Sequence, residues 1–270
     1  MEHADDSSEF LMNLNSSDES RKLHDAYNEQ YSDNMTEWRE LGAKFKAQNI
    51  ISVCSGRSFN KVLECGAGEG SILQWLDAAK FTKSLHALEI SDSGISQIEK
   101  RKIPSLSEIR KFDGYKIPYA AEEFDLSYCS HVLEHVEHPR LLLRELKRVS
   151  KFHVFEIPLD YSMQVDKKIQ HYLAYGHINI FTPSLFKFLL KSEGFEIIDE
   201  RFTTMKSEVR RFNWYRMMGR KKTLITEAMI SVYPWYQTLK RLVSGKARYD
   251  EYGYSAYTCL AKASGELRVF

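Results

Sequence analysis

Three glycines on alternate positions follow a short apolar run in the segment NKVLECGAGEGSIL, residues 60–73. They are Gly66, Gly68 and Gly70, and Glu64 precedes them. A strand that enters a glycine-rich turn and then a helix presents bare backbone N–H groups and the positive end of a helix dipole to a ligand. Glycine is needed where φ is positive or where a Cβ would touch that ligand. The segment therefore predicts a ligand-binding loop.

Dinucleotides bind to a related loop with the pattern G-x-G-x-x-G. Here the third glycine comes one position early, and Ser71 stands where that pattern has glycine. Glu64 and Glu69 also bring two carboxylates to the loop, which would repel a pyrophosphate. A ligand that carries an ammonium and a sulfonium suits two carboxylates, so the loop disfavours a dinucleotide.

A second chemical group is the run HVLEHVEHP, which places His131, His135 and His138 within eight residues. Three imidazoles at short spacing are a metal-binding alternative. A helix that begins near Pro139 would leave them on a loop and a turn with no common face. We therefore expect no metal site from these histidines.

Strand-like and helical patterns alternate from residue 61 onward. The strand-like runs are 61–65, 84–90, 108–112, 124–129, 152–157, 195–203 and 255–262. Helical patterns fall between most of them, at 70–80, 93–102, 138–150 and 183–193. Such alternation predicts βαβ units and an α/β, Rossmann-like fold, with a seven-stranded, mostly parallel sheet covered by helices on both faces.

Composition divides the chain into parts. We expect an acidic flexible N-terminus at 1–24, a helical cap at 25–54, a main domain at 55–204 and 253–264, and a helical insertion at 205–252. The cap carries Tyr27, Tyr31 and Trp38 at helical spacing, which we expect to pack against the domain. The insertion is basic, with eleven Lys or Arg against two Glu from 205 to 248, and it is expected to break at Pro234.

The whole chain has 270 residues, 43% of them hydrophobic, and a net charge of +1. This charge neither favours nor excludes a nucleic-acid partner. The four cysteines have no paired spacing, which predicts reduced core thiols. No apolar stretch is long enough to span a bilayer, and the N-terminus lacks the apolar region of a signal peptide, so a cytoplasmic protein is expected.

The order of these motifs resembles the class I S-adenosylmethionine-dependent methyltransferases. The loop reads E-x-G-x-G-x-G, Glu89 ends the second strand in LHALEIS, and Asp113 follows the third in RKFDGYKIP. The run FDLSYCSHVLEHVEHPRLLLRELKRVSK then matches the fourth strand, its loop and the next helix of the family's largest branch. The chain looks most like bacterial members linked to modification of sugars, lipids or secondary metabolites.

This resemblance implies S-adenosyl-L-methionine as the cofactor. Glu89 would accept the two ribose hydroxyls, and Asp113 would accept the adenine amino group. Asp113 could instead form an Asx turn before Gly114. The complete set of expected cofactor contacts is Glu64, Gly66, Ala67, Gly68, Gly70, Glu89, Ile90, Asp113, Gly114, Ser130 and His131.

The resemblance also implies in-line transfer of a methyl group, in which alignment of the acceptor is the largest effect. A hydroxyl acceptor would need a general base, whereas an amine could do without one. His131 follows the fourth strand, and His177 and Asp160 lie in the loop after the fifth, so these three are the candidate bases. The expected reaction is O- or N-methylation of a small-molecule, sugar or lipid-linked acceptor.

Several alternatives remain open. The insertion is a lid over the acceptor pocket, a membrane-surface contact through 214–248, or an RNA-binding segment, and a packed cap is the favoured interpretation. The protein is a monomer or a dimer. An RNA or protein methyltransferase is the alternative within the class, and a non-catalytic cofactor-binding scaffold is the alternative outside it.

Overall fold

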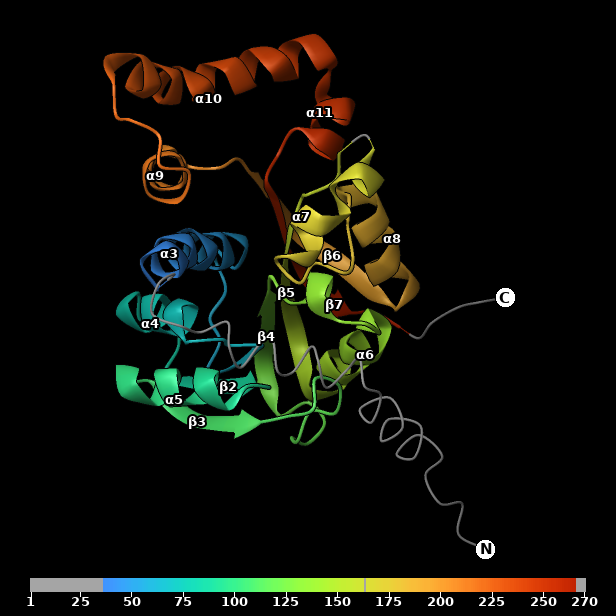
Figure 1. Cartoon of the computed structure of the whole chain (residues 1–270). Helices are drawn as coiled ribbons and strands as arrows, with labels where there is room; N and C mark the ends of the chain where they lie inside the picture. The colour runs from blue at the N-terminus through green and yellow to red at the C-terminus, as the bar shows by residue number, and fades with distance from the viewer. Residues whose placement is uncertain (1–35, 163, 266–270) are drawn as a thin grey trace, which may run out of the picture.

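The computed structural model describes residues 36–162 and 164–265 (Figure 1). The acidic segment 1–24 and the first part of the expected cap, with Tyr27 and Tyr31, lie outside the described residues. The rest of that cap forms the helix α3, Thr36–Val53.

The described residues form one seven-stranded sheet in the order β3-β2-β1-β4-β5-β7-β6. The strands are β1 Lys61–Cys65, β2 Ser84–Glu89, β3 Leu106–Lys111, β4 Phe124–Ser130, β5 Ser150–Pro158, β6 Phe195–Thr203 and β7 Ala256–Ala263. The strands β1 to β5 pair in parallel, and β7 runs antiparallel to both β5 and β6. The predicted Rossmann-like sheet is therefore confirmed.

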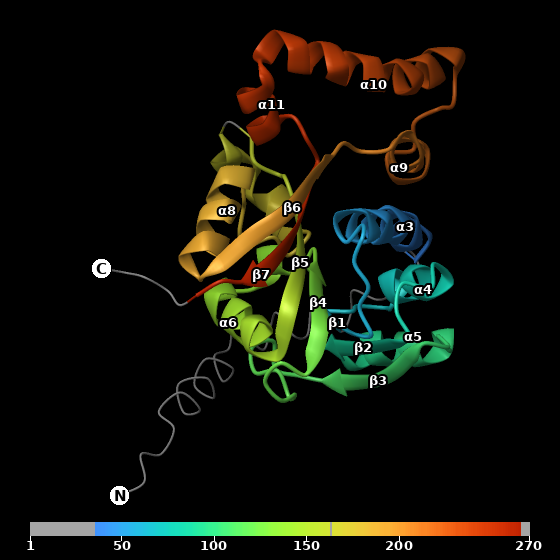
Figure 2. The same cartoon turned by 180° about the vertical axis from the view of Figure 1, so that it is seen from behind.

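Helices cover both faces of the sheet (Figures 1 and 2). They are α4 Ser71–Ala78, α5 Asp92–Arg101, α6 Pro139–Val149, α7 Ile169–Leu173 and α8 Pro183–Ser192. One core lies under α3, α4 and α5, and the other lies under α6 and α8. Apolar positions at helical spacing supply both cores, which is why the predicted helices agree with the observed ones to within about two residues.

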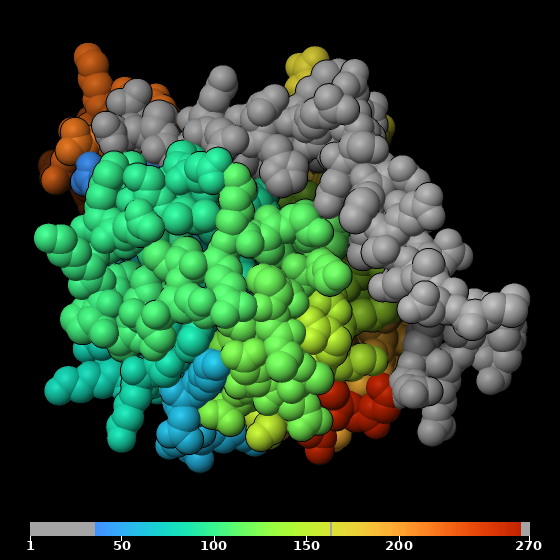
Figure 3. Space-filling model, turned by 90° about the horizontal axis from the view of Figure 1, so that it is seen from below, coloured from blue at the N-terminus to red at the C-terminus, as the bar shows by residue number. Residues whose placement is uncertain are grey.

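The ends of two helices follow from local sequence signals. Ser91 caps α5 by accepting the backbone N–H of Gly94, and Thr182 caps α8 by accepting that of Leu185. Pro183 then occupies the first turn of α8, where its missing N–H costs nothing. Viewed from below, residues of α5 and β3, in green, form much of the surface, as expected for the edge strand β3 (Figure 3).

The insertion consists of helices that stand apart from the sheet. They are α9 Ser207–Phe212, a π-helical turn Asn213–Met217, α10 Leu224–Ser244 and α11 Lys246–Tyr252. Both views place α9 beside α3 and α10 beyond it (Figures 1 and 2). Trp38 on α3 donates its indole N–H to Asn213 across 2.9 Å, which joins the insertion to the cap.

The predicted helix break at Pro234 is wrong, because Pro234 lies inside α10, which is one continuous helix of 21 residues. Proline removes one backbone donor and usually kinks a helix. Here both halves are held: the N-terminal half contacts α9, and Gln237 in the C-terminal half accepts a hydrogen bond from Tyr249 of α11 at 2.8 Å. Contacts on both sides of Pro234 keep the helix continuous.

All four cysteines are buried and free, as predicted. Among residues 36–162 and 164–265, no helix combines the length and the apolar character needed to cross a bilayer.

Candidate active site

The glycine-rich loop has the backbone that its sequence predicts. Gly66, Gly68 and Gly70 all have positive φ, at 77°, 57° and 79°. A Cβ on Gly66 would lie 2.5 Å from Cγ2 of Val132, in the loop after β4. Only glycine lets these two loops approach each other so closely.

Glu89 connects the glycine-rich loop to the next helix. It ends β2 and is buried, and its Oε2 accepts the backbone N–H of Gly68 at 2.7 Å. Its Oε1 accepts both the backbone N–H and the hydroxyl of Ser91, the residue that caps α5. The carboxylate is thus held in one orientation while it lines the pocket at this edge of the sheet.

Glu69 does not act on the loop as the sequence suggests. Its carboxylate pairs with Arg39 at 2.7 Å and with Arg101 at 3.1 Å, and the Ser71 hydroxyl donates to it at 2.7 Å. Two guanidinium groups compensate its charge, so Glu69 gives no ground for excluding a pyrophosphate. The position of the third glycine is what disfavours a dinucleotide.

Glu64 lies beneath the loop. Its side chain is buried and accepts the hydroxyl of Tyr128 at 2.7 Å. Burial raises the pKa of Glu64 to about 8, with a further contribution from the charge of Glu89, while the Tyr128 hydrogen bond opposes the shift. Glu64 is not among the residues that line the pocket, and its contact with a cofactor stays a prediction.

A pocket of about 270 Å³ opens at the carboxyl edge of the strands. The segments after β1, β2 and β3 line it with Gly66, Glu89, Ile90, Phe112 and Gly114. The segments after β4 and β5 line it with His131, Val132, Glu134, His135, Val136, Leu142, Tyr175 and His177. Trp38, Arg39 and Lys46 reach the pocket from α3. The structure thus brings the loop glycine, the ribose-type carboxylate and two of the three candidate bases to one cavity.

Two other expected contacts are placed differently. Oδ1 of Asp113 accepts the backbone N–H groups of Tyr115 and Lys116, at 2.8 and 2.7 Å, which is the Asx-type turn that the sequence left open. Ser130 is buried at the end of β4, and its hydroxyl has no partner among the described residues. The contacts of both residues with a cofactor stay predictions.

The candidate bases His177 and Asp160 form a pair. Nδ1 of His177 lies 2.7 Å from Oδ2 of Asp160. Because a carboxylate only accepts, Nδ1 carries the proton and Nε2 is left with its lone pair. Tyr172 donates its hydroxyl to the backbone oxygen of Asp160 at 2.6 Å and accepts the backbone N–H of His177 at 3.0 Å. These bonds fix the pair at the rim of the pocket.

His135 lies beside this pair. Its Nδ1 donates to the backbone oxygen of Gly176 at 2.9 Å, and its ring lies 4.8 Å from that of His177, nearly perpendicular. Burial lowers the pKa of His135, which keeps the imidazole neutral at neutral pH. The backbone N–H of Asn179 also donates to the backbone oxygen of Glu134 at 2.9 Å. This bond joins the loop after β4 to the loop after α7.

His131 lines the pocket and has a positive φ of 56°. Its Nδ1 lies 3.5 Å from Glu134 and its Nε2 lies 3.3 Å from Glu156. Glu156 lies near the end of β5, and its carboxylate also accepts hydrogen bonds from Asn49 of α3 and Thr258 of β7. The imidazole of His131 thus lies between two buried carboxylates.

Glu134, Glu156 and Lys46 were not singled out from the sequence. Burial lowers the pKa of the Lys46 ammonium, while the nearby Glu156, Glu134 and Glu64 oppose that shift. The sequence does not show that these residues lie together at the site. Glu134 lies inside the histidine run, and Glu156 lies near the end of a strand. His138, in contrast, turns away from the pocket and packs near Tyr115.

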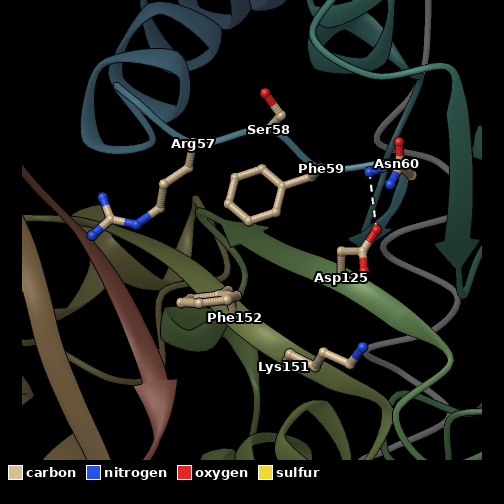
Figure 4. Close-up of a pocket in the computed structure, with 7 residues that line it drawn as sticks. All are labelled: Arg57, Ser58, Phe59, Asn60, Asp125, Lys151 and Phe152. Carbon is tan, nitrogen blue, oxygen red and sulfur yellow. Dashed lines mark hydrogen bonds between the residues drawn. The ribbon is translucent and has the colours of Figure 1, made fainter.

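A second hollow lies at the opposite, amino-terminal edge of the strands (Figure 4). Phe59 and Phe152 pack in it with ring centroids 5.8 Å apart. Asp125 accepts the backbone N–H of Asn60 at 2.9 Å, as the dashed line shows. Ligands of open α/β sheets bind at the carboxyl ends of strands, so this hollow has no part in the site.

Comparisons with known proteins agree with this geometry. Residues 63–153 match the family described as a methyltransferase domain. No curated protein matches the sequence.

Three solved structures share the fold. Geranyl diphosphate C-methyltransferase from Streptomyces coelicolor, in complex with Mg²⁺, geranyl diphosphate and S-adenosylhomocysteine, has a TM-score of 0.61 at 12% identity, covering 92% of this chain and 99% of that one. Phosphoethanolamine N-methyltransferase 2 of Haemonchus contortus, with phosphomonomethylethanolamine and S-adenosylhomocysteine, has a TM-score of 0.56 at 11% identity, covering 90% and 60%. A SAM-dependent methyltransferase from Archaeoglobus fulgidus has a TM-score of 0.54 at 20% identity, covering 84% and 97%. Residues 63–153 of this chain thus match a methyltransferase domain, within the Rossmann-like fold of the class I methyltransferases.

Proposed function

We propose that this protein transfers a methyl group from S-adenosyl-L-methionine to a small-molecule acceptor. The observation that carries the proposal is that Gly66, Glu89, His131 and His177 line one pocket. We place the cofactor at Gly66 and Glu89, the first end of the pocket, and the acceptor at His131 and His177, the second. The first end has the bare loop and fixed carboxylate that suit a nucleoside, and the second has titratable groups at the place where a methyl acceptor would lie.

The cofactor fits these residues through their chemistry. The Glu89 carboxylate would accept the ribose hydroxyls, while Phe112 and Gly114 would border the adenine. The amino acid part would lie over Gly66 and toward Lys46 and Arg39. This orientation directs the methyl group to the His131 end of the pocket.

The residues at that end would align the acceptor and exclude water. His177 presents Nε2 with a free lone pair, because Asp160 holds its other ring nitrogen. An acceptor hydroxyl could pass its proton there as the sulfonium transfers its methyl group, which typically contributes about 10²–10⁴-fold. An amine acceptor would need only the alignment. Either O- or N-methylation is compatible with these groups.

A small acceptor is supported by the related structures, which hold geranyl diphosphate and phosphomonomethylethanolamine. The comparison with sugar- and lipid-modifying bacterial enzymes rests on the sequence resemblance alone. RNA or protein methylation and cofactor binding without catalysis are the other interpretations, and all of them require the cofactor binding that the test below measures.

Calorimetry and thermal unfolding with S-adenosylmethionine and S-adenosylhomocysteine test the proposal, with NAD and ATP as controls. A ligand at 100 times its Kd stabilises a protein by about 2.7 kcal/mol. We expect stabilisation by the two sulfur nucleosides only, and its loss in Glu89→Ala. Glu196→Ala is the matched control, since Glu196 is exposed on β6 at the far edge of the sheet. Absence of binding by protein free of carried-over ligand would reject the enzyme and leave a scaffold.

A peripheral membrane contact is a further part of the proposal, supported by α10. Its exposed apolar side chains recur every three or four residues: Ile225, Met229, Val232, Trp235, Tyr236, Leu239, Leu242 and Val243. Trp235 is 77% exposed. Basic residues stand at both ends of the helix, at Arg220, Lys221 and Lys222 and at Lys240, Arg241 and Lys246. An apolar stripe bordered by cations suits the surface of an anionic bilayer.

Vesicle co-sedimentation tests this contact. We expect the protein to pellet with vesicles that contain phosphatidylserine, and pelleting to fall at least several-fold in Trp235→Glu/Leu239→Glu. Phe188→Glu is the control, because Phe188 is equally exposed on α8. Equal pelleting of both variants, or dimerisation through α10 in place of pelleting, would remove the membrane contact.

A further inference from the structure

Three side chains at the acceptor end of the pocket face one another although they come from different loops. They are Glu134, His135 and His177, and one ligand atom from each lies within 4.8 Å of the other two. Oε1 of Glu134 is 3.8 Å from Nε2 of His135, and the two imidazole rings are 4.8 Å apart. Two imidazoles and a carboxylate that converge on one point are a typical set of metal ligands.

The buried carboxylate of Glu134 gives an independent indication of a cation-binding site. Its side chain is only 1% exposed, and neither carboxylate oxygen has a hydrogen-bond partner within the described part of the chain. Burial of an unpaired carboxylate is costly, and buried charges are normally paired or coordinate a metal. Nδ1 of His131 is 3.5 Å away, beyond hydrogen-bond contact, so the described residues leave both oxygens available.

The groups behind the two histidines are also those expected at a metal site. His135 donates its Nδ1 proton to the backbone oxygen of Gly176, and His177 donates its own to the carboxylate of Asp160. In metal-binding histidines the second ring nitrogen almost always donates to a carbonyl or a carboxylate, which fixes the ring and makes the free nitrogen more basic. In the neutral ring of His177 this leaves Nε2 as a lone-pair donor. Nε2 of His135 lies 3.8 Å from Oε1 of Glu134.

We infer that Glu134, His135 and His177 bind a divalent transition-metal ion at the acceptor end of the pocket. Imidazole ligands favour Zn²⁺, Co²⁺ or Fe²⁺ over Mg²⁺ and Ca²⁺, which prefer oxygen. Metal–ligand distances of about 2.0–2.2 Å set ligand atoms roughly 3.0–3.6 Å apart. The 3.8 Å separation between Glu134 and His135 is close to this range, and side-chain rotation brings in the third ligand. Three protein ligands leave a position open for the acceptor.

The role of the ion, unlike its binding, rests on the proposed methyl transfer. An acceptor hydroxyl on the open position would lose its proton more readily, because the cation stabilises the oxyanion. The proton would leave to solvent. The oxyanion would then form the new C–O bond as the S–C bond of the sulfonium breaks, and sulfur would keep that electron pair to give S-adenosylhomocysteine. With the ion bound, His177 would be one of its ligands, and this route would replace the proton transfer to Nε2 of His177 proposed above for the ion-free pocket.

Titration of the full-length, chelator-treated protein with Co²⁺ tests the site, followed by the visible absorption of four- or five-coordinate cobalt. We expect one equivalent per chain, displaced by Zn²⁺. Glu134→Gln, His135→Ala and His177→Ala should each weaken Co²⁺ binding by more than roughly 100-fold, and Asp160→Asn by about 10–100-fold. His171→Ala is the matched control, because its exposed ring contacts only Tyr172 and Tyr175 in the described chain.

Far-UV circular dichroism and thermal unfolding would show that each variant is folded. The inference is overturned if the parent shows no stoichiometric cobalt spectrum, or if His135→Ala/His177→Ala binds Co²⁺ as tightly as the parent does. S-adenosylhomocysteine binding, measured on the metal-free protein, tests the proposed function separately. A metal site without cofactor binding, or cofactor binding without a metal site, would identify which of the two ideas had failed.

Discussion

Nδ1 of His177 and Oδ2 of Asp160 are 2.7 Å apart, although 17 residues separate them in the chain. Asp160 lies between β5 and α7, and His177 follows α7. Tyr172 of α7 bonds to the backbone of both residues. The loop is thus closed on itself at the rim of the pocket. Its closure sets the orientation of an imidazole that points to the acceptor end.

Asp160→Asn should lower turnover roughly 10²–10⁴-fold. The amide keeps the volume of the carboxylate but can donate to Nδ1, which favours the wrong tautomer of His177. Affinity for S-adenosylhomocysteine should change less than about threefold, since Asp160 does not line the pocket. Single-turnover transfer of labelled methyl, with calorimetry beside it, would check both. Asp166→Asn, an exposed change in the same loop, should have no effect, and equal turnover of the two variants would contradict the assignment.

Gly66→Ala should destabilise the protein by about 1–3 kcal/mol and weaken cofactor binding. The new Cβ would meet Val132 at 2.5 Å, and alanine would be strained at a φ of 77°. Adding Val132→Ala should recover only the part of the lost free energy of unfolding that comes from the clash with Val132. A double-mutant cycle in urea can separate this part from the backbone strain. Gly42→Ala, inside α3 with no atom within 4 Å of the added Cβ, should be neutral or slightly stabilising. If Gly66→Ala lowers the free energy of unfolding no more than Gly42→Ala does, the close approach of the two loops is excluded.

Glu64→Gln should reduce the loss of stability with rising pH. Burial raises the pKa of Glu64 from 4.5 to about 8, so the folded protein keeps a proton that the unfolded chain has lost. Stability from this group is fully present below pH 4.5 and is lost as pH rises toward about 8. The amide keeps an acceptor for the Tyr128 hydroxyl and has no proton to lose. Urea unfolding at pH 5, 6.5 and 8 should show the variant gaining on the parent by up to a few kcal/mol. Parallel curves for the parent and Glu64→Gln would contradict this, and Glu99→Gln on the exposed face of α5 serves as the control.

Arg101→Met should destabilise the glycine-rich loop by about 1–3 kcal/mol. The Arg101 guanidinium donates to the backbone oxygen of Glu69 at 2.6 Å, to its carboxylate and to the Ser71 hydroxyl. Arg39 remains as a second partner of Glu69, which limits the loss. Glu69→Gln in the Arg101→Met background should restore part of it by removing the buried charge. Thermal unfolding would measure the loss of stability in Arg101→Met, with Lys100→Met, a change at an exposed neighbour, as the control. Equal stability of the two variants would refute the prediction.

The sheet could be predicted because the buried face of each element imposes its period on the sequence. KVLEC was expected at 61–65 and forms Lys61–Cys65, and α8 begins at Pro183, directly after the Thr182 cap. The prediction at Pro234 was wrong because contacts with α9 and α11 hold the helix together across the proline. Such contacts between distant segments do not appear in a local sequence pattern. Element types follow from neighbours in sequence, whereas continuity depends on neighbours in space.

The same distinction separates the two ends of the pocket. The loop glycines and Glu89 could be found because one βαβ unit places them together. His135 and His177 could not be paired, because the loop after α7 must first fold over the loop after β4 through the Asn179–Glu134 contact. Glu134 was visible in the sequence, but its unpaired carboxylate is a property of the folded chain only.

Thr203 of β6 pairs with Ala256 of β7, and the backbone N–H of Ser255 donates to the Thr203 oxygen at 2.8 Å. The chain that forms α9, α10 and α11 therefore leaves the sheet and re-enters it at adjacent positions. In evolutionary terms these helices replace the turn of a hairpin, and their length or surface can change without moving the register of any strand. Selection can thus alter the surface of α10 while the strands that position the pocket keep their register.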